Sequence, residues 1–316
     1  MAEAPPYWEL SLPVSEEVSE ALTNLAWELG ALGVVEDTVL RAFFAPDVPP
    51  EPLAARVTEY LADLRALGYA IDSRPPSVLP IADQNWAEAW KAHFRPIEVG
   101  TRLLIASPWN IPPTARLVVV IEPGRAFGTG HHGSTAGCLA LLDGLYPSRT
   151  NASRCRPFER VLDIGTGSGI LAIAAAKLGA SGALALDIDP DAVSSAVANA
   201  ARNGVTEQVQ CVVGDIEDDR REERRPPLRA GHCADAAPAP GPGATFPLVL
   251  ANLLPSAHAR LADRYQQIVE PNGALVLGGI PSRDVLDVAR RLEPCGFRTE
   301  RHEEIDGWVS LALTRS

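Results

Sequence analysis

The chain has 316 residues, of which 46% are hydrophobic, and its formal net charge is −12 at pH 7. This length exceeds that of a typical single domain, so we expect one large and one small domain, each with its own core. An acidic surface repels phosphate backbones, which argues against direct binding of nucleic acid; it suits a basic protein partner or serves solubility alone.

The five cysteines are widely scattered, and none has the spacing of a zinc site or a redox pair. Free thiols in a reducing cytoplasm are the simple interpretation. No signal peptide is evident. The most apolar region, 170–186, is interrupted by Lys177, glycine and serine, which fits a buried helix and strand better than a membrane span. We therefore expect a soluble cytoplasmic protein that does not bind membranes or metal, and we expect it to be a monomer.

The first 76 residues alternate between strand and helix patterns. Strands are predicted at 7–12, 34–35, 39–44 and 69–73, and helices at 15–29 and 52–67. The order β-α-β-β-α-β is that of the ferredoxin-like split βαβ motif. It predicts a small α+β domain over residues 1–76, although such a fold decides no function by itself.

Two consecutive prolines, Pro75 and Pro76, favour an extended connection and mark the predicted domain boundary. Residues 83–94 then have the pattern of a helix with Trp86 and Trp90 on one face, and we assign 77–95 to a linker helix. Packing against a neighbouring domain accounts for these tryptophans without any role in binding.

Residues 96–316 have the pattern of an α/β domain. Strands are predicted at 103–106, 117–121, 160–164, 183–187, 208–213, 247–251, 273–279, 297–304 and 308–314, and helices at 135–145, 169–178, 190–203, 256–269 and 283–293. The alternation predicts a mostly parallel sheet covered on both faces. The last two strands turn at Asp306-Gly307 without a helix and predict an antiparallel last strand. This outline is that of a class I, Rossmann-like methyltransferase.

Residues 217–245 interrupt this pattern. They are charged at first and then rich in alanine, proline and glycine. Such a composition buries little apolar surface, so we predict a disordered insertion that joins two strand ends at the surface.

A glycine-rich loop at 163–169 follows an apolar strand and opens an apolar helix. Gly165 and Gly167 allow the backbone to approach a ligand, and the helix N-terminus presents unpaired N–H groups. A dinucleotide-binding loop would need its third glycine at position 170, where this chain has Ile170. Asp163 favours a cationic ligand over a phosphate. The loop therefore favours S-adenosylmethionine over a nicotinamide dinucleotide, and a methyltransferase over a dehydrogenase.

Polar side chains end the next strands. Asp187 is placed to accept the two ribose hydroxyls, and Asp189 to cap the following helix. Asp215 follows the third strand, where such enzymes often contact adenine, although a solvated loop acid would give the same pattern. Asn252 ends the fourth strand and, with nearby backbone carbonyls, can orient an attacking amine; a simple turn residue is the alternative.

A second glycine-rich loop, 122–135, precedes these strands and carries His131, His132 and Thr135. We predict that it covers the methionine end of the cofactor. The two histidines are candidates for proton handling, although loop histidines are more often structural.

Together these motifs resemble those of the bacterial ribosomal protein L11 methyltransferases over nearly the whole chain. The resemblance is carried by Asn85-Trp-x-x-x-Trp90-Lys91, the loop at 122–135, the loop at 161–170, Asp187-Ile-Asp-Pro190 and Ala251-Asn-Leu-Leu254. Related enzymes that act on other proteins share the catalytic domain and usually lack the N-terminal one.

The resemblance implies that the N-terminal domain holds ribosomal protein L11, and that methyl groups pass from S-adenosylmethionine to its lysine side chains and N-terminal amine. It also implies cofactor contacts at Thr135, Gly165, Asp187 and Asn252. Two positions depart from the family pattern, Glu122 in place of aspartate and Gly133 in place of proline, and the glycine should loosen the loop.

The predicted mechanism is in-line attack of a neutral amine on the sulfonium methyl, with positioning and desolvation supplying most of the rate. A lysine with a solution pKa of about 10.4 is mostly protonated at neutral pH. The site must favour the neutral amine, through apolar Phe127 and Leu253 and through carbonyl groups near Asn252. Two alternatives remain: the same chemistry on another protein or a small molecule, and a cofactor-binding module without catalysis.

Overall fold

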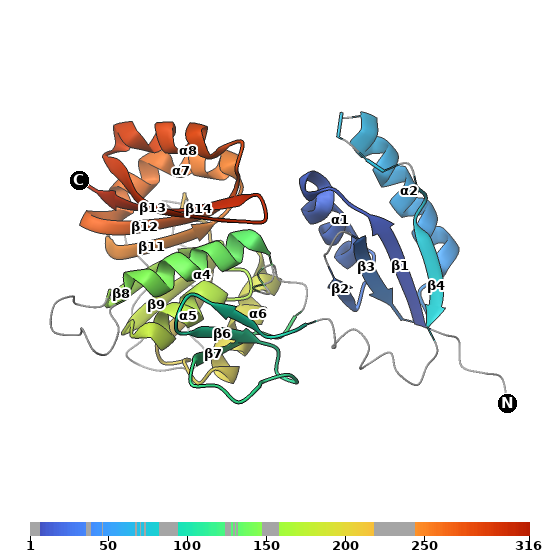
Figure 1. Ribbon diagram of the computed structural model, residues 1–316, viewed down its shortest axis with the longest axis horizontal. Helices are drawn as coiled ribbons and strands as arrows, with labels where there is room; N and C mark the ends of the chain where they lie inside the picture. The colour runs from blue at the N-terminus through green and yellow to red at the C-terminus, as the bar shows by residue number, and fades with distance from the viewer. Residues whose placement is uncertain are drawn as a thin grey trace. The chain divides into compact units, whose positions relative to one another are not determined.

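The computed structural model describes residues 7–35, 39–45, 47–66, 68–69, 71–72, 74–81, 94–123, 128, 130, 132–146, 158–217 and 244–316. The chain divides into two compact units, residues 1–95 and 96–316 (Figure 1). Within the described ranges, no helix is long and apolar enough to cross a membrane.

The N-terminal unit is an antiparallel sheet with two helices. Its elements are β1 (Tyr7–Pro13), α1 (Glu16–Glu28), β2 (Gly33–Val35), β3 (Val39–Phe44), α2 (Pro50–Ala66) and β4 (Ser77–Ile81). The sheet order is β2-β3-β1-β4, and every pairing is antiparallel. Leu10 of β1, Leu22 of α1 and Leu53 of α2 belong to one buried core, so both helices pack on the same face of the sheet.

The fourth strand lies later in the chain than the sequence pattern predicted. We expected it at 69–73, but the strand that pairs with β1 is Ser77–Ile81. The chain turns around Asp72 instead, because Arg65 donates to its carbonyl and its carboxylate accepts from the amide and guanidinium of Arg74. The two prolines therefore precede the last strand of this sheet. Residues 83–93 of the predicted helix, with both of its tryptophans, lie outside the described residues.

The C-terminal unit is built on a seven-stranded sheet with the order β10-β9-β8-β11-β12-β14-β13. Its elements are β8 (Arg160–Ile164), α5 (Ile170–Leu178), β9 (Gly182–Asp187), α6 (Pro190–Arg202), β10 (Val209–Val213), β11 (Phe246–Asn252), α7 (Pro255–Ile268), β12 (Val269–Pro281), α8 (Val285–Leu292), the short 3-10 helix η3 (Glu293–Cys295), β13 (Phe297–Ile305) and β14 (Trp308–Arg315). The strands from β10 to β12 pair in parallel, and β14 is antiparallel to both of its neighbours. The predicted Rossmann-like methyltransferase sheet is confirmed.

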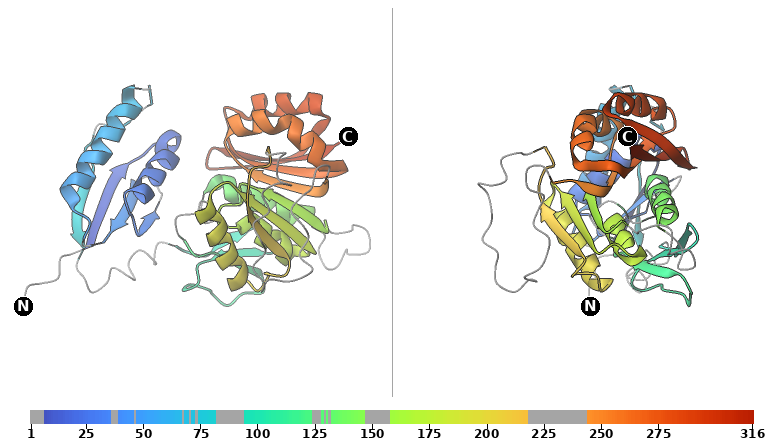
Figure 2. Two further views of the ribbon diagram at one scale, coloured as in Figure 1. Left: turned by 180° about the vertical axis from the view of Figure 1, so that it is seen from behind. Right: turned by 90° about the vertical axis from the view of Figure 1, so that its left-hand side faces the viewer.

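Two cores lie on opposite faces of this sheet, because successive side chains of a strand point to opposite sides. Val161 and Leu250 face the core shared with α4 (Gly133–Leu145) and α5. Leu162 and Val249 face the core shared with α7 and α8. Figures 1 and 2 show α7 and α8 on one side of the sheet and α4 and α5 on the other.

A small three-stranded sheet precedes the large one. It consists of β5 (Ile97–Val99), β6 (Leu103–Ala106) and β7 (Leu117–Val120), of which β5 was not predicted. Asp143 of α4 anchors it, accepting from the Thr101 amide at 2.8 Å and from Arg102 Nε at 2.7 Å. Burial alone would raise the pKa of Asp143, but these hydrogen bonds and the Arg102 charge lower it overall. The Asp143 carboxylate thus holds the small sheet against α4.

Candidate active site

One edge of the large sheet collects the polar residues that the sequence pattern placed at strand ends. The carboxyl ends of parallel strands meet at a single edge, which is where ligands bind in open α/β sheets. The loop after β8, Asp187 at the end of β9, Asp215 after β10 and Asn252 at the end of β11 all lie there. Trp308 joins them, because the start of antiparallel β14 pairs with the end of β12.

The loop after β8 depends on its glycines. Gly165, Gly167 and Gly169 have φ values of 67°, 54° and 83°, a left-handed conformation that costs glycine little. A Cβ atom on Gly165 would collide with the Leu253 side chain. The loop backbone therefore lies directly against the Leu253 side chain, so the structure brings together two residues that the sequence analysis singled out separately.

Asp163 lies beneath this loop. It is 1% exposed, and its Oδ2 accepts from the Thr166 hydroxyl at 2.6 Å and from the Ala172 amide at 3.2 Å. Burial raises the pKa of Asp163 to about 7, and these two hydrogen bonds oppose the shift. Oδ2 thus organises the turn, while Oδ1 has no partner in the described part of the chain.

Asp187 ties the second strand to the glycine loop. Its Oδ2 accepts from the Gly167 amide at 2.9 Å, and its Oδ1 accepts from the Asp189 amide at 3.0 Å. Each carboxylate oxygen has a second lone pair, so the half-buried side chain can still accept two hydroxyl groups. Asp189 caps α6 as predicted, accepting from the Asp191 amide. Asp215 is exposed and accepts from the Glu217 amide.

Asn252 and Thr135 meet across the site although 117 residues separate them. Asn252 Nδ2 donates to Thr135 Oγ1 at 3.2 Å, which joins the β11 end to the first turn of α4. Asn252 Oδ1 is buried and has no partner among the described residues. An unpaired buried acceptor costs about 1–3 kcal/mol. A ligand N–H donor that reached this oxygen would remove that cost.

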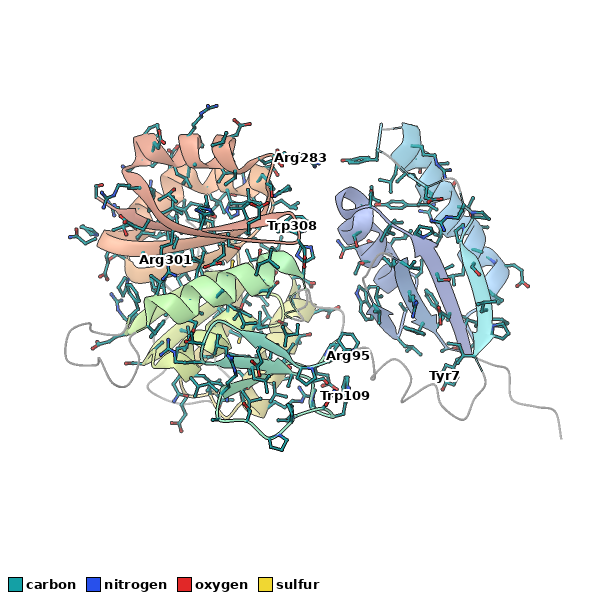
Figure 3. All side chains as sticks on the ribbon, in the orientation of Figure 1. Tyr7, Arg95, Trp109, Arg283, Arg301 and Trp308 are labelled. Atoms are coloured by element: carbon teal, nitrogen blue, oxygen red, sulfur yellow. The ribbon has the colours of Figure 1, made fainter. Side chains whose placement is uncertain are left out.

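The start of α4 packs against the β13–β14 turn. His132 Nδ1 lies 2.8 Å from Ser134 Oγ and caps the helix, and the His132 ring packs on Trp308 with ring centroids 4.6 Å apart. Trp308 is labelled in Figure 3. A Cβ atom on Gly133 would collide with the Ile305 carbonyl oxygen. Gly133 therefore permits a close approach between α4 and the end of β13, and whether it also loosens the loop stays a prediction.

The described part of the second glycine-rich loop contacts the first. Ser168 Oγ donates to the Gly128 carbonyl at 2.6 Å, and Asn199 of α6 donates to the Ser168 carbonyl at 2.9 Å. The same Asn199 accepts from the Glu122 amide at 3.1 Å. Phe127 and His131, two of the residues singled out in the sequence, lie outside the described residues.

Sequence reasoning missed Trp308, Asn199 and the buried His258 of α7. Trp308 follows the predicted Asp306-Gly307 turn, but no local pattern places that turn beside α4. Asn199 resembles any helix asparagine until its partners are known. His258 and Tyr265 are seven residues apart, a helical spacing that puts them on one face and could have been noticed.

A glycine loop between a strand and a helix, an acid at the end of the next strand and an asparagine at the end of the fourth define a class I methyltransferase that uses S-adenosylmethionine. The residues present fit that cofactor: Asp187 offers acceptors for ribose hydroxyls, the glycine loop allows close approach of the backbone, and the unpaired Asn252 Oδ1 suits a donor.

Comparison with known proteins gives the family. The family model described as ribosomal protein L11 methyltransferase (PrmA) matches residues 6–316. The ribosomal protein L11 methyltransferase of Trichlorobacter lovleyi is 34% identical, covering 98% of each chain. That of Syntrophotalea carbinolica is 37% identical, covering 78% of this chain and 72% of the other. The crystal structure of the L11 methylase from Lactobacillus delbrueckii subsp. bulgaricus matches with a TM-score of 0.55 and 25% identity, covering 71% of this chain and 100% of the other. The chain belongs to the ribosomal protein L11 methyltransferase family.

Proposed function

We propose that this protein transfers methyl groups from S-adenosylmethionine to lysine side chains and to the N-terminal amine of ribosomal protein L11. The observation that carries the proposal is the buried, unpaired Oδ1 of Asn252, an acceptor at the β11 end beside Thr135. Family membership over residues 6–316, and the names of the relatives, support L11 as the acceptor protein.

The cofactor would be held along the sheet edge. Asp187 would accept the ribose hydroxyls, and Asp215 would lie near the adenine. The backbone of Gly165 and Gly167 would approach the cofactor closely, and Thr135 would contact its methionine end. The free Oδ1 of Asp163 would face the positive charge of the ligand. When bound, the cofactor supplies an electrophilic methyl group on a sulfonium.

The acceptor amine would lie beside Asn252. Its nitrogen lone pair would attack the methyl group that the bound cofactor supplies, held in line by Asn252 and the neighbouring backbone carbonyls. The amine then loses a proton to water. Leu253, Phe127 and Trp308 would supply apolar surroundings that favour the neutral amine, while Asn252 Oδ1 would accept its N–H.

No described residue is placed as a dedicated base. His132 is engaged in capping α4, and His258 is fully buried away from solvent. We therefore propose that positioning and desolvation supply most of the rate.

We propose that the N-terminal unit recognises L11. Its element order and its sheet order support a ferredoxin-like recognition domain that extends through β4, to Ile81, and not only to the predicted boundary at residue 76. The net charge of −12 suits a basic ribosomal protein and disfavours direct contact with RNA. We further propose a monomer that works in the cytoplasm, where its acceptor is made, with a surface insertion at 217–245.

The test uses purified L11 and labelled S-adenosylmethionine, with Asp187→Ala enzyme as the matched control. We expect label to enter L11 with the wild-type enzyme and not with the variant. Label entering another protein or a small molecule in a lysate, with none entering purified L11, would favour the same chemistry on a different acceptor. Cofactor binding without transfer to any acceptor would favour a non-catalytic module.

A further inference from the structure

A buried histidine lies behind the β11 end, on the first turn of α7. His258 and Tyr265 are both 0% exposed, and Tyr265 belongs to the core between α7, α8 and the sheet. A polar ring in an apolar core is costly unless both of its nitrogens are hydrogen-bonded. Both nitrogens of His258 have hydrogen-bond partners: one is a hydroxyl group and the other a backbone carbonyl.

The partners fix the protonation of the ring. Nε2 lies 2.7 Å from the Gly278 carbonyl oxygen, which can only accept, so Nε2 carries the hydrogen. Nδ1 lies 3.0 Å from the Tyr265 hydroxyl and accepts its hydrogen. Burial lowers the pKa of His258 to about 4, and hydrogen bonding to the Gly278 and Leu253 carbonyls opposes that shift. The ring is thus neutral at physiological pH, in a single tautomer.

Gly278 joins this histidine to the site. Its carbonyl also accepts from the Leu253 amide at 3.3 Å, and Gly278 pairs with Asn252 in the sheet register. A Cβ atom on Gly278 would lie 2.8 Å from Asn252 Oδ1, and one on Gly279 would collide with the Leu253 carbonyl. The backbone at 278–279 therefore packs directly against Asn252 and Leu253.

We propose that His258, held by Tyr265, is a positioning residue that fixes the Gly278 carbonyl and through it the Asn252–Leu253 end of β11. The proposal rests on the proposed function, because that strand end is where the acceptor amine would bind. His258 touches neither cofactor nor amine; it acts through the shared carbonyl. Its loss should lower kcat while leaving the cofactor contacts at Asp187 unchanged.

The test compares two substitutions at His258 in the full chain. His258→Leu keeps an apolar side chain of moderate size and removes the donor, whereas His258→Gln can place an amide N–H near the position of Nε2. Ile268→Val, which removes a buried methyl group at the far end of α7, controls for general loss of packing. kcat and KM for L11, the Kd for S-adenosylmethionine and Tm are measured for each.

We expect His258→Leu to lower kcat about tenfold, with the Kd for S-adenosylmethionine within about twofold of wild type, and His258→Gln to recover most of the loss. Ile268→Val should lower Tm and leave kcat unchanged. A His258→Leu enzyme that folds and keeps kcat within about twofold of wild type would overturn the proposal. So would a parallel loss of kcat and Tm in both the Leu and the Gln variants.

Hydrogen exchange of the Leu253 amide can be measured without any protein that accepts the methyl group. We expect it to quicken about tenfold in His258→Leu and to stay close to wild type in His258→Gln. Unchanged exchange in His258→Leu would contradict the positioning role. If the wild-type enzyme did not methylate L11, the proposed acceptor would be wrong, and this exchange experiment would still decide the role of His258.

Discussion

Replacing Asp187 should weaken cofactor binding more than any other single change at the strand ends. Asp187 Oδ2 and Oδ1 accept from the backbone amides of Gly167 and Asp189, and both oxygens retain lone pairs for ribose hydroxyls. A hydrogen bond to a charged group contributes about 1.5–3 kcal/mol. The carboxylate is half-buried, so we use the lower end of that range for two bonds. Asp187→Ala should then cost about 3 kcal/mol, or about a hundredfold in Kd.

Isothermal titration with S-adenosylmethionine measures this change. Asp189→Ala is the matched control, because Asp189 only caps α6 and its loss should cost about 1 kcal/mol of stability with little change in Kd. Asp187→Asn, which keeps one carbonyl oxygen, should fall between wild type and Asp187→Ala. The reasoning would be refuted by a Kd for Asp187→Ala within about threefold of wild type. An equal weakening in Asp189→Ala would refute it as well.

The structure also predicts the direction of three further effects, on turnover, on stability and on the pH dependence of stability. Asn252→Ala should lower kcat far more than it weakens cofactor binding, and steady-state kinetics giving the reverse order would contradict the amine-positioning role. Gly133→Ala pushes a Cβ atom into the carbonyl at the end of β13 and should cost about 1–3 kcal/mol by chemical denaturation, whereas Gly182→Ala, which meets open space, should not. Because His258 has a folded pKa of about 4 and an unfolded value near 6.5, its neutral form stabilises the fold above pH 6.5. That contribution should be lost as the pH falls from about 6.5 to about 4, and the loss should be absent in His258→Leu when urea unfolding is followed against pH. Asp163, whose pKa is raised to about 7, has the opposite effect on the pH dependence of stability. The contribution of His258 is therefore the difference between the stability curves of wild type and His258→Leu.

The large sheet was predictable because its central strands, such as β8 and β11, are buried on both faces and appear as apolar runs between helices. The strand at 160–164 has the predicted bounds in the structure. The last strand of the N-terminal sheet was not predictable in this way. Ser77–Ile81 is half-exposed and contains Pro80, so neither periodicity nor composition marks it, and only its pairing with β1 makes it a strand.

The site could be predicted as far as topology determines it. Parallel strands bring their carboxyl ends together, so the nearness of Asp187 and Asn252 to the glycine loop followed from element order alone. The contacts between α4 and the rest of the site did not follow, because Thr135 meets Asn252 across 117 residues of chain. Gly133 shows the same limit, because no local sequence pattern places the Ile305 carbonyl beside it.

The most direct test of the account is residue-level mass mapping of purified L11 after incubation with this enzyme and S-adenosylmethionine. We expect mass increases of whole methyl groups on lysine side chains and on the N-terminal amine, absent with Asp187→Ala and strongly reduced with Asn252→Ala. Unmodified L11 after incubation with folded wild-type enzyme that binds the cofactor would contradict it.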